Sequence, residues 1–271
     1  MNFNTKLSVL ASSLALGALG FATQASAAPL PAGYTCVGGS VCGTLGADGD
    51  VTTSPQGGDY GYVSTAGAVG NNGDLNIGSE TNSSVARSPI FSASNGDLLE
   101  FYFNYVTSDG TLSFIEYSWV KLIDTVSSAE TILFTARTTP TGNTVPGFGL
   151  PGLAPGVVLT PGSTAIIDGL TNWSPLAGSS GACYGGIGGG CGQTGWIGMD
   201  YAIGTASNYF LEFGVVNWGD QSLDSGLAFD GITIAGNPID PNPTPEPASL
   251  ALLGVALAGL GAARAKAKKA V

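Results

Sequence analysis

Short segments rich in β-branched and aromatic residues, each bounded by turn-forming residues, constrain the fold of this chain most strongly. The segment DLLEFYFNYV at residues 97–106 is the clearest, because Leu99, Phe101 and Phe103 alternate with other residues along it. A period of two places alternate side chains on opposite faces of a β-strand. The 43 glycines and 15 prolines separate such segments, which is typical of proteins with short strands and many turns.

These segments predict an all-β fold: a single antiparallel β-sandwich, jelly-roll-like, over residues 28–237. The Ser-Asp-Gly turn at 108–110 predicts that the first two long strands form a β-hairpin, and the last two strands are expected to form another. The proline-rich and glycine-rich stretch 138–161 is expected to be a surface excursion. The predicted strands are residues 97–106, 112–124, 130–137, 195–203, 208–218 and 227–234, with shorter ones around 60–63, 89–93 and 164–168.

The N-terminal residues have the pattern of a secretory signal peptide. Lys6 supplies a positive charge, an apolar stretch covers residues 7–21, and Ala25-Ser26-Ala27 provides small residues at the A-x-A positions. This pattern predicts removal of residues 1–27 by signal peptidase. An uncleaved membrane anchor is the alternative, but the apolar stretch is short for it.

Charge and composition exclude several classes of function. The formal net charge is −11, and of the eight basic residues only Arg87, Lys121 and Arg137 fall within residues 28–237. A domain with so few basic residues lacks the positively charged surface that binding to nucleic acid requires. No nucleic-acid partner is therefore expected. The chain has no histidine, which excludes Ser-His-Asp catalysis, Cys-His catalysis and histidine-ligated metal sites.

The C-terminal end, PNPTPEPASLALLGVALAGLGAARAKAKKAV, combines three kinds of segment. Residues 238–247 alternate with proline and predict an extended linker. Residues 248–263 are uncharged and predict a short transmembrane helix, although about 20 residues are usual for a full span. The basic tail at 264–271 is expected to stay in the cytoplasm by the positive-inside rule.

Pro245-Glu246-Pro247, followed by the apolar helix and a basic cluster that begins at Arg264, resembles the PEP-CTERM sorting signal. The resemblance implies a Gram-negative bacterium that makes exopolysaccharide, and an exosortase-type membrane protease that recognises Pro-Glu-Pro and removes the helix. The chain would then reside in the inner membrane transiently before it reaches the cell surface or the extracellular space. A plain C-terminal anchor is the alternative.

The body of the chain carries a second resemblance. The stretches FYFNYVTSDG, TARTTP and GVVNWGDQSLDSGLAFDGI are similar to stretches that recur in one group of PEP-CTERM proteins without an assigned activity. This resemblance implies a fold and a location, and it implies no catalytic residues.

Four cysteines in an exported chain predict two disulfides. Cys36 and Cys42 are close in sequence, as are Cys183 and Cys191. Pairing within each close pair is predicted, because cross-pairing would require two distant loops to meet. A zinc site is the alternative, but neither spacing is Cys-x-x-Cys.

The carboxylates are the candidates for chemistry. Asp220 and Asp224 lie in the turn of the last predicted hairpin, and oxygen-rich loops of this kind can hold calcium. The alternative is a local role in turns, where aspartate accepts hydrogen bonds from nearby backbone N–H groups. No other cofactor is expected. Glu100, Glu116 and Glu212 lie in predicted strands, where an outward-facing charge is ordinary.

Three classes of function follow. The first is a non-enzymatic surface or matrix protein that acts beside exopolysaccharide or in a biofilm. The second is a carbohydrate-binding module that stacks sugar rings on Trp173, Trp196, Trp218 or exposed tyrosines. The third is a glycoside hydrolase that uses two carboxylates about 5–9 Å apart at the base of a cleft.

Overall fold

The computed structural model describes residues 27–111, 113–138, 144–162 and 166–239. Within these ranges the chain is almost entirely β-structure, and helix is limited to the 3-10 helix η1 (Ser174–Ser179). No helix in the described ranges is long and apolar enough to cross a membrane. Residues 1–26 of the predicted signal peptide (1–27) and residues 240–247 of the predicted linker (238–247) lie outside them. The predicted transmembrane helix 248–263 and the basic tail 264–271 also lie outside them.

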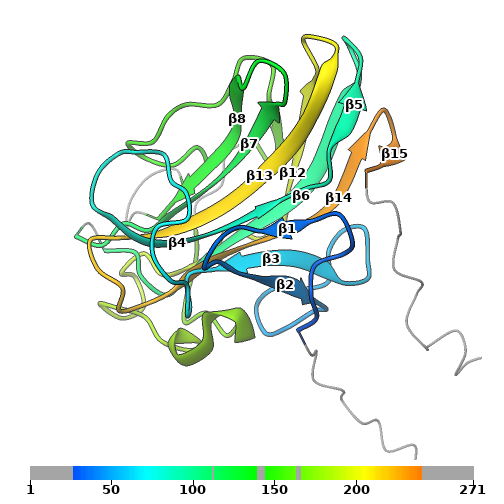
Figure 1. Cartoon of the computed structure of the whole chain (residues 1–271). Coiled ribbons are helices and arrows are strands. Elements are labelled where there is room, and N and C mark those ends of the chain that lie inside the picture. The colour runs from blue at the N-terminus through cyan, green and yellow to red at the C-terminus, as the bar shows by residue number, and fades with distance from the viewer. Residues whose placement is uncertain (1–26, 112, 139–143, 163–165, 240–271) are drawn as a thin grey trace, which may run out of the picture.

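The described strands form two antiparallel sheets (Figure 1). Sheet A contains nine of them: β2 (Val41–Leu45), β3 (Tyr60–Ser64), β6 (Leu98–Thr107), β9 (Val158–Thr160), β10 (Ile167–Asp168), β11 (Gly192–Gln193), β12 (Ile197–Ala202), β14 (Ser225–Ile234) and β15 (Asn237–Pro238). Sheet B contains the other six: β1 (Thr35–Cys36), β4 (Glu80–Arg87), β5 (Phe91–Ala93), β7 (Tyr117–Asp124), β8 (Glu130–Arg137) and β13 (Ser207–Trp218).

The central strands of each sheet carry most of the pairing. Sheet A runs in the order β10-β11-β6-β14-β3-β2, and sheet B runs in the order β1-β4-β13-β7-β8. The all-β, antiparallel prediction is therefore confirmed. The jelly-roll-like type remains a prediction.

Aromatic side chains pack the two sheets against each other. The ring of Phe103 in β6 stacks on Phe134 in β8, with 3.7 Å between ring centroids. The ring of Phe213 in β13 stacks on Phe229 in β14 at 3.9 Å. Each pair joins one residue of sheet A to one of sheet B, so the core lies between the sheets. Burial of large aromatic surfaces of this kind is a main source of folding free energy.

Strand β4 has little of the alternation that predicts the other long strands, so no strand is predicted there from the sequence. Its residues Asn82, Ser83 and Ser84 are polar yet buried. Ser84 Oγ donates to the carbonyl oxygen of Ser64 at 2.5 Å and accepts from the amide of Val41 at 2.8 Å. These bonds satisfy a buried polar group and connect sheet B to sheet A, because buried polar side chains need partners.

Both predicted hairpins are wrong. Strand β6 belongs to sheet A and β7 to sheet B, so residues 108–116 cross from one sheet to the other. Strands β13 and β14 are likewise divided between the sheets, and residues 219–224 make the second crossing. Turn residues mark where a strand ends, but they do not say whether the next strand pairs with it or faces it. Here β7 is buried along almost its whole length, and pairing with β13 and β8 covers both its edges.

The cysteines form the bonds Cys36–Cys42 and Cys183–Cys191, with Cα–Cα distances of 5.9 and 5.8 Å. This is the pairing that the spacing in the sequence predicts. The first bond joins β1 of sheet B to β2 of sheet A. The second closes a loop rich in glycine.

Gly214 provides a test of the packing on the face of sheet B that points away from the core between the sheets. It pairs across β13 and β7 with the buried Trp119, and a Cβ atom at Gly214 would lie 2.1 Å from the tryptophan ring. Gly214→Ala is therefore expected to lower the free energy of unfolding by about 1–3 kcal/mol, because the ring or the strand must move. Denaturant titration measures the change. The control is Gly204→Ala, where an added Cβ meets nothing within 4 Å; equal stability losses in both variants would contradict this account.

Candidate functional site

The two crossings between the sheets lie side by side at one end of the core. A Cβ atom built on Gly219, in the second crossing, would lie 3.1 Å from the ring of Phe114 in the first. Strands β7 and β13, which flank the crossings, pair through Tyr117 and Val216. Residues far apart in the sequence therefore meet at this end of the molecule.

Four buried polar residues gather here, and we call them the buried polar cluster: Asp109, Glu116, Ser118 and Asn217. Each is at most 2% exposed. Each also has a side-chain atom without a hydrogen-bond partner among the described residues: Asp109 Oδ1, Glu116 Oε2, Ser118 Oγ, and both Oδ1 and Nδ2 of Asn217. Buried polar atoms without partners are rare in folded proteins, so this concentration marks the cluster as the site to explain.

Burial dominates the electrostatics of Glu116. It raises the pKa of this carboxyl well above its usual value, and the nearby carboxylates of Asp109, Asp220 and Asp224 raise the pKa further. The amide of Trp218, which donates to Glu116 Oε1 at 3.2 Å, acts in the opposite direction. The expectation that Glu116 faces outward is wrong, because the chain carries it into the interior just before β7 begins.

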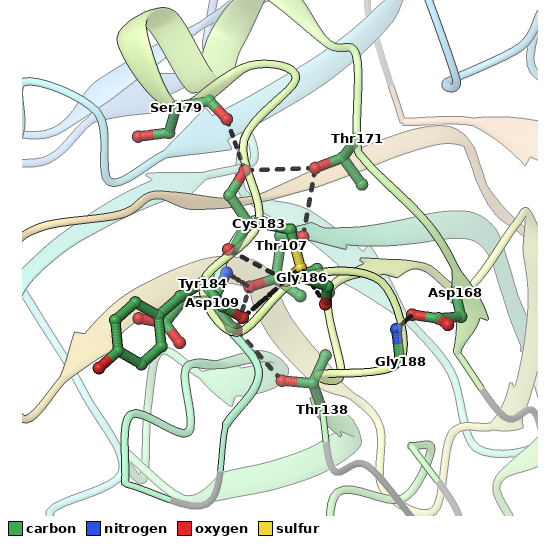
Figure 2. The surroundings of a disulfide bond; sticks show 12 residues. Thr107, Asp109, Thr138, Asp168, Thr171, Ser179, Cys183, Tyr184, Gly186 and Gly188 are labelled. Carbon is green, nitrogen blue, oxygen red and sulfur yellow. Dashed lines mark hydrogen bonds between the residues drawn. A yellow bond between two sulfur atoms is a disulfide. The ribbon is translucent and has the colours of Figure 1, made fainter.

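The second disulfide holds the loop that carries Asp109 (Figure 2). The amide of Tyr184, next to Cys183, donates to the carbonyl oxygen of Ser108 at 3.1 Å. Ser108 Oγ in turn donates to the carbonyl oxygen of Ser179 at 2.8 Å. Burial raises the pKa of Asp109 to about 6, and the charge of Asp220 contributes to the rise. The sequence placed Asp109 in a hairpin turn, so its burial could not be foreseen.

The two aspartates predicted to bind calcium lie in the second crossing, but they do not form a free pair. Asp220 Oδ1 accepts from the amide of Ser222 at 3.0 Å, which is the local turn role that the sequence left open. The carboxylate of Asp224 accepts from Thr65 Oγ1 at 3.1 Å and from Ser179 Oγ at 2.6 Å. Across the described ranges, no group of three or more His, Cys, Asp or Glu side chains is arranged to hold a metal.

The tryptophans proposed for sugar stacking do not form an exposed row. Trp173 is 1% exposed, and its indole N–H donates to Tyr60 Oη at 2.9 Å. Trp196 is half-buried and donates to the carbonyl oxygen of Thr52 at 3.0 Å. Trp218 is half-buried, donates to the carbonyl oxygen of Gly78 and lies under the guanidinium of Arg137.

Glu212 and Glu100 differ in burial. Glu212 is 6% exposed rather than outward-facing, and its carboxylate lies 3.0 Å from Arg87 and 4.0 Å from Lys121. Glu100 is half-buried and accepts a bond from Thr233 Oγ1 at 3.4 Å.

A cavity of about 420 Å³ opens elsewhere on the molecule, beside β3 and β14. Its walls come from the segment 28–31, the loop 56–59 and residues 229–233. The ring of Tyr34 stacks near Phe229, with 6.4 Å between ring centroids, and supplies an apolar wall. Polar side chains on the lining include Gln56, Asp59 and Asp230. No local sequence pattern predicts this cavity, because segments that are far apart in the chain build it.

The raised carboxyl pKa values predict how stability depends on pH. At about pH 4 and below, the carboxyl of Glu116 is protonated in both folded and unfolded chains and has no effect. At higher pH the unfolded chain loses this proton while the folded chain keeps it, so the free energy of unfolding falls. The negative charges of Asp109, Asp220 and Asp224 reinforce the effect, and the positive charge of Arg137 opposes it.

Glu116→Gln removes this penalty. In metal-free buffer the variant is expected to be more stable than the natural chain at pH 7.5, and the difference should shrink as the pH approaches 4. Urea titration at both pH values measures it, with Glu100→Gln as the control of matched chemistry. An unchanged difference across this range would show that burial does not shift the pKa of Glu116.

Comparison with known proteins identifies one segment outside the described residues. A family model described as the PEP-CTERM protein-sorting motif matches residues 243–266. None of the curated proteins matches the chain. Among solved structures, the K1 cleaved adhesin domain of Lys-gingipain from Porphyromonas gingivalis W83 is similar over 80% of this chain and 100% of that chain, with 13% identity and a TM-score of 0.37.

The matched segment contains Pro245, Glu246, Pro247 and Arg264, the residues on which the resemblance in the sequence rests. The motif implies export to the cell surface or the extracellular space, and processing by an exosortase, which is a membrane protease. The chain therefore carries a PEP-CTERM protein-sorting motif at residues 243–266.

Proposed function

We propose that this chain is a non-enzymatic protein of the cell surface or the extracellular matrix, which exosortase cuts from its C-terminal membrane segment and which acts beside the cell's exopolysaccharide. The sorting motif at residues 243–266 carries the proposal. On this view a signal peptidase removes residues 1–27, and the apolar segment 248–263 holds the chain in the inner membrane until it is cut.

The disulfides in the described part of the molecule support a location outside the cytoplasm. All four cysteines are paired in disulfides, and disulfides persist mainly in oxidising compartments. The partners of Asp224 and Glu212 support a structural role for these two carboxylates. Asp224 is held by two hydroxyls and Glu212 by two cationic side chains, so both act as structural braces.

Processing tests the proposal directly. The exported chain is expected to lack residues 248–271, because exosortase cuts next to the Pro-Glu-Pro motif. Replacing Pro245, Glu246 and Pro247 by alanine should leave the C-terminal segment attached and the protein in the membrane fraction. Intact-mass measurement of surface and membrane fractions reads out both results.

Pro241→Ala is the matched control, since this proline lies in the same linker but outside the matched motif. It should be processed like the natural chain. Natural protein that reaches the surface with residues 248–271 intact would refute the proposal.

A second candidate function is carbohydrate binding, and the cavity beside β3 and β14 favours it. A volume of about 420 Å³ falls within the range of small-molecule sites. The Tyr34 ring lines the cavity with apolar surface, while Gln56 and Asp59 supply polar side chains on its lining. A neutral sugar needs this combination, because its ring faces are apolar and its hydroxyls need polar partners.

A polysaccharide pull-down with the full chain tests this candidate. Tyr34→Ala is expected to weaken binding roughly tenfold, which is the loss of about one aromatic contact. Phe148→Ala is the control, because Phe148 is 66% exposed and does not line the cavity. Equal binding by both variants would remove the cavity from consideration, while leaving the processing result untouched.

A further inference from the structure

We propose that the buried polar cluster binds one calcium ion, held by the carboxylates of Asp109 and Glu116 and the amide oxygen of Asn217. This site differs from the pair Asp220 and Asp224 that the sequence suggests. It would lie between the two sheets, where the two crossings meet.

The pairing of β7 with β13 brings two of the ligands together. Tyr117 pairs with Val216 and Ser118 with Val215. The pairing ends at Tyr117, and continuing the same antiparallel register by one residue would set Glu116 opposite Asn217. Residues that face each other in this way carry their side chains on the same face, with Cβ atoms about 4.5–5.5 Å apart. The bond from the Trp218 amide to Glu116 Oε1 confirms that the two strand ends remain in contact.

The face on which they lie is the inner one. Along β7, Val120 and Leu122 belong to the core between the sheets, whereas Tyr117 and Trp119 belong to a separate cluster. Alternation along a strand therefore turns Glu116 and Ser118 inward. Val215 of β13 also belongs to the inner core, and Asn217 follows it by one period.

In the described residues the carboxylates of Asp109 and Glu116 form no direct ion pair, and the opposite charge that acts on Glu116 is the guanidinium of Arg137. Lys121 pairs with Glu130 and Glu212. Arg137 donates instead to the carbonyl oxygens of Ile115 and Phe148. Buried carboxylates without such partners are costly unless a cation or a proton neutralises them.

The available atoms favour calcium among the divalent cations. They are oxygens of two carboxyl groups, an amide and a hydroxyl, and calcium accepts six to eight oxygen ligands in irregular geometry. Zinc prefers nitrogen and sulfur, but all four cysteines are in disulfides and the chain lacks histidine. The set contains only two side chains of the His, Cys, Asp and Glu types, and no group of three or more of these is arranged to hold a metal in the described residues.

The second disulfide holds the loop that lies beside Asp109, one of the proposed ligands. The backbone of Gly110 lies so close to that of Gly190 that a Cβ atom on Gly110 would be 2.1 Å from the Gly190 carbonyl oxygen. The loop closed by Cys183 and Cys191 therefore fixes the position of the neighbouring Asp109. A ligand held in place before binding loses less conformational entropy when the ion arrives.

Equilibrium dialysis of the full chain against radioactive calcium tests the proposal. We expect one ion per chain, with a dissociation constant of about 10⁻³ M or lower. Calcium chloride at several times that concentration should raise the melting temperature by about 2–4 °C over the value in chelator. Magnesium chloride should have a much smaller effect, because magnesium demands regular octahedral geometry.

Variants locate the ion. Glu116→Gln and Asn217→Ala should each abolish the calcium-dependent rise in melting temperature, whereas Glu100→Gln and Asp220→Asn should retain it. Loss in Asp220→Asn with retention in Glu116→Gln would overturn the assignment and place the ion in the second crossing. If either cluster variant fails to fold, dialysis of the natural chain decides. Absence of bound calcium, with equal melting curves in calcium and chelator, would show that protons neutralise the cluster instead.

Discussion

Stacking of phenylalanine rings across the core is the interaction on which the rest of this structure depends. Phe103 meets Phe134 and Phe213 meets Phe229, so each contact joins one sheet to the other. Sheets that face each other lie about 10 Å apart, and the rings fill that space. Because the sheets are held apart in this way, a connection from one sheet to the other has to span the gap between them at an end of the core.

The crossings explain why polar groups are buried at one end of an apolar core. Residues 108–116 and 219–224 both pass between the sheets there, and they carry Asp109 and Asp220 with them. Backbone and side-chain hydrogen bonds satisfy part of this region, as with Asp224. The buried polar cluster is the part that they leave unsatisfied, which makes it the strongest place in the described structure for a bound ion.

The architecture of the described residues is consistent with export. The sorting motif implies that the chain functions outside the cytoplasm, where disulfides form and weak calcium sites can be occupied. Both disulfides also lie where the sheets or their connections meet: Cys36–Cys42 joins β1 to β2, and Cys183–Cys191 holds the loop beside Asp109. They strengthen positions that backbone pairing alone does not secure.

The sequence alone determined the features that depend on local pattern. Strand β8 occupies residues 130–137, as alternation and turn residues predict, and the sorting motif lies where its proline, apolar and basic segments stand in order. Close spacing likewise predicts the partner of each cysteine. Strand β4 could not be predicted in this way, because its buried residues Asn82, Ser83 and Ser84 are polar and interrupt the alternation of apolar and polar residues.

Only the tertiary structure decided which strands share a sheet, and this changed the meaning of the site residues. A turn sequence is compatible with a hairpin or with a crossing, since it specifies where the chain reverses but not where it packs. The crossing buried Glu116, carried it to the end of β13 that holds Asn217 and brought Asp109 near. The cavity could not be predicted from local pattern either, because residues 28–34 and 229–233 meet only when the sheets are complete. Such contacts depend on the free energy of the whole packed core, and no local pattern records them.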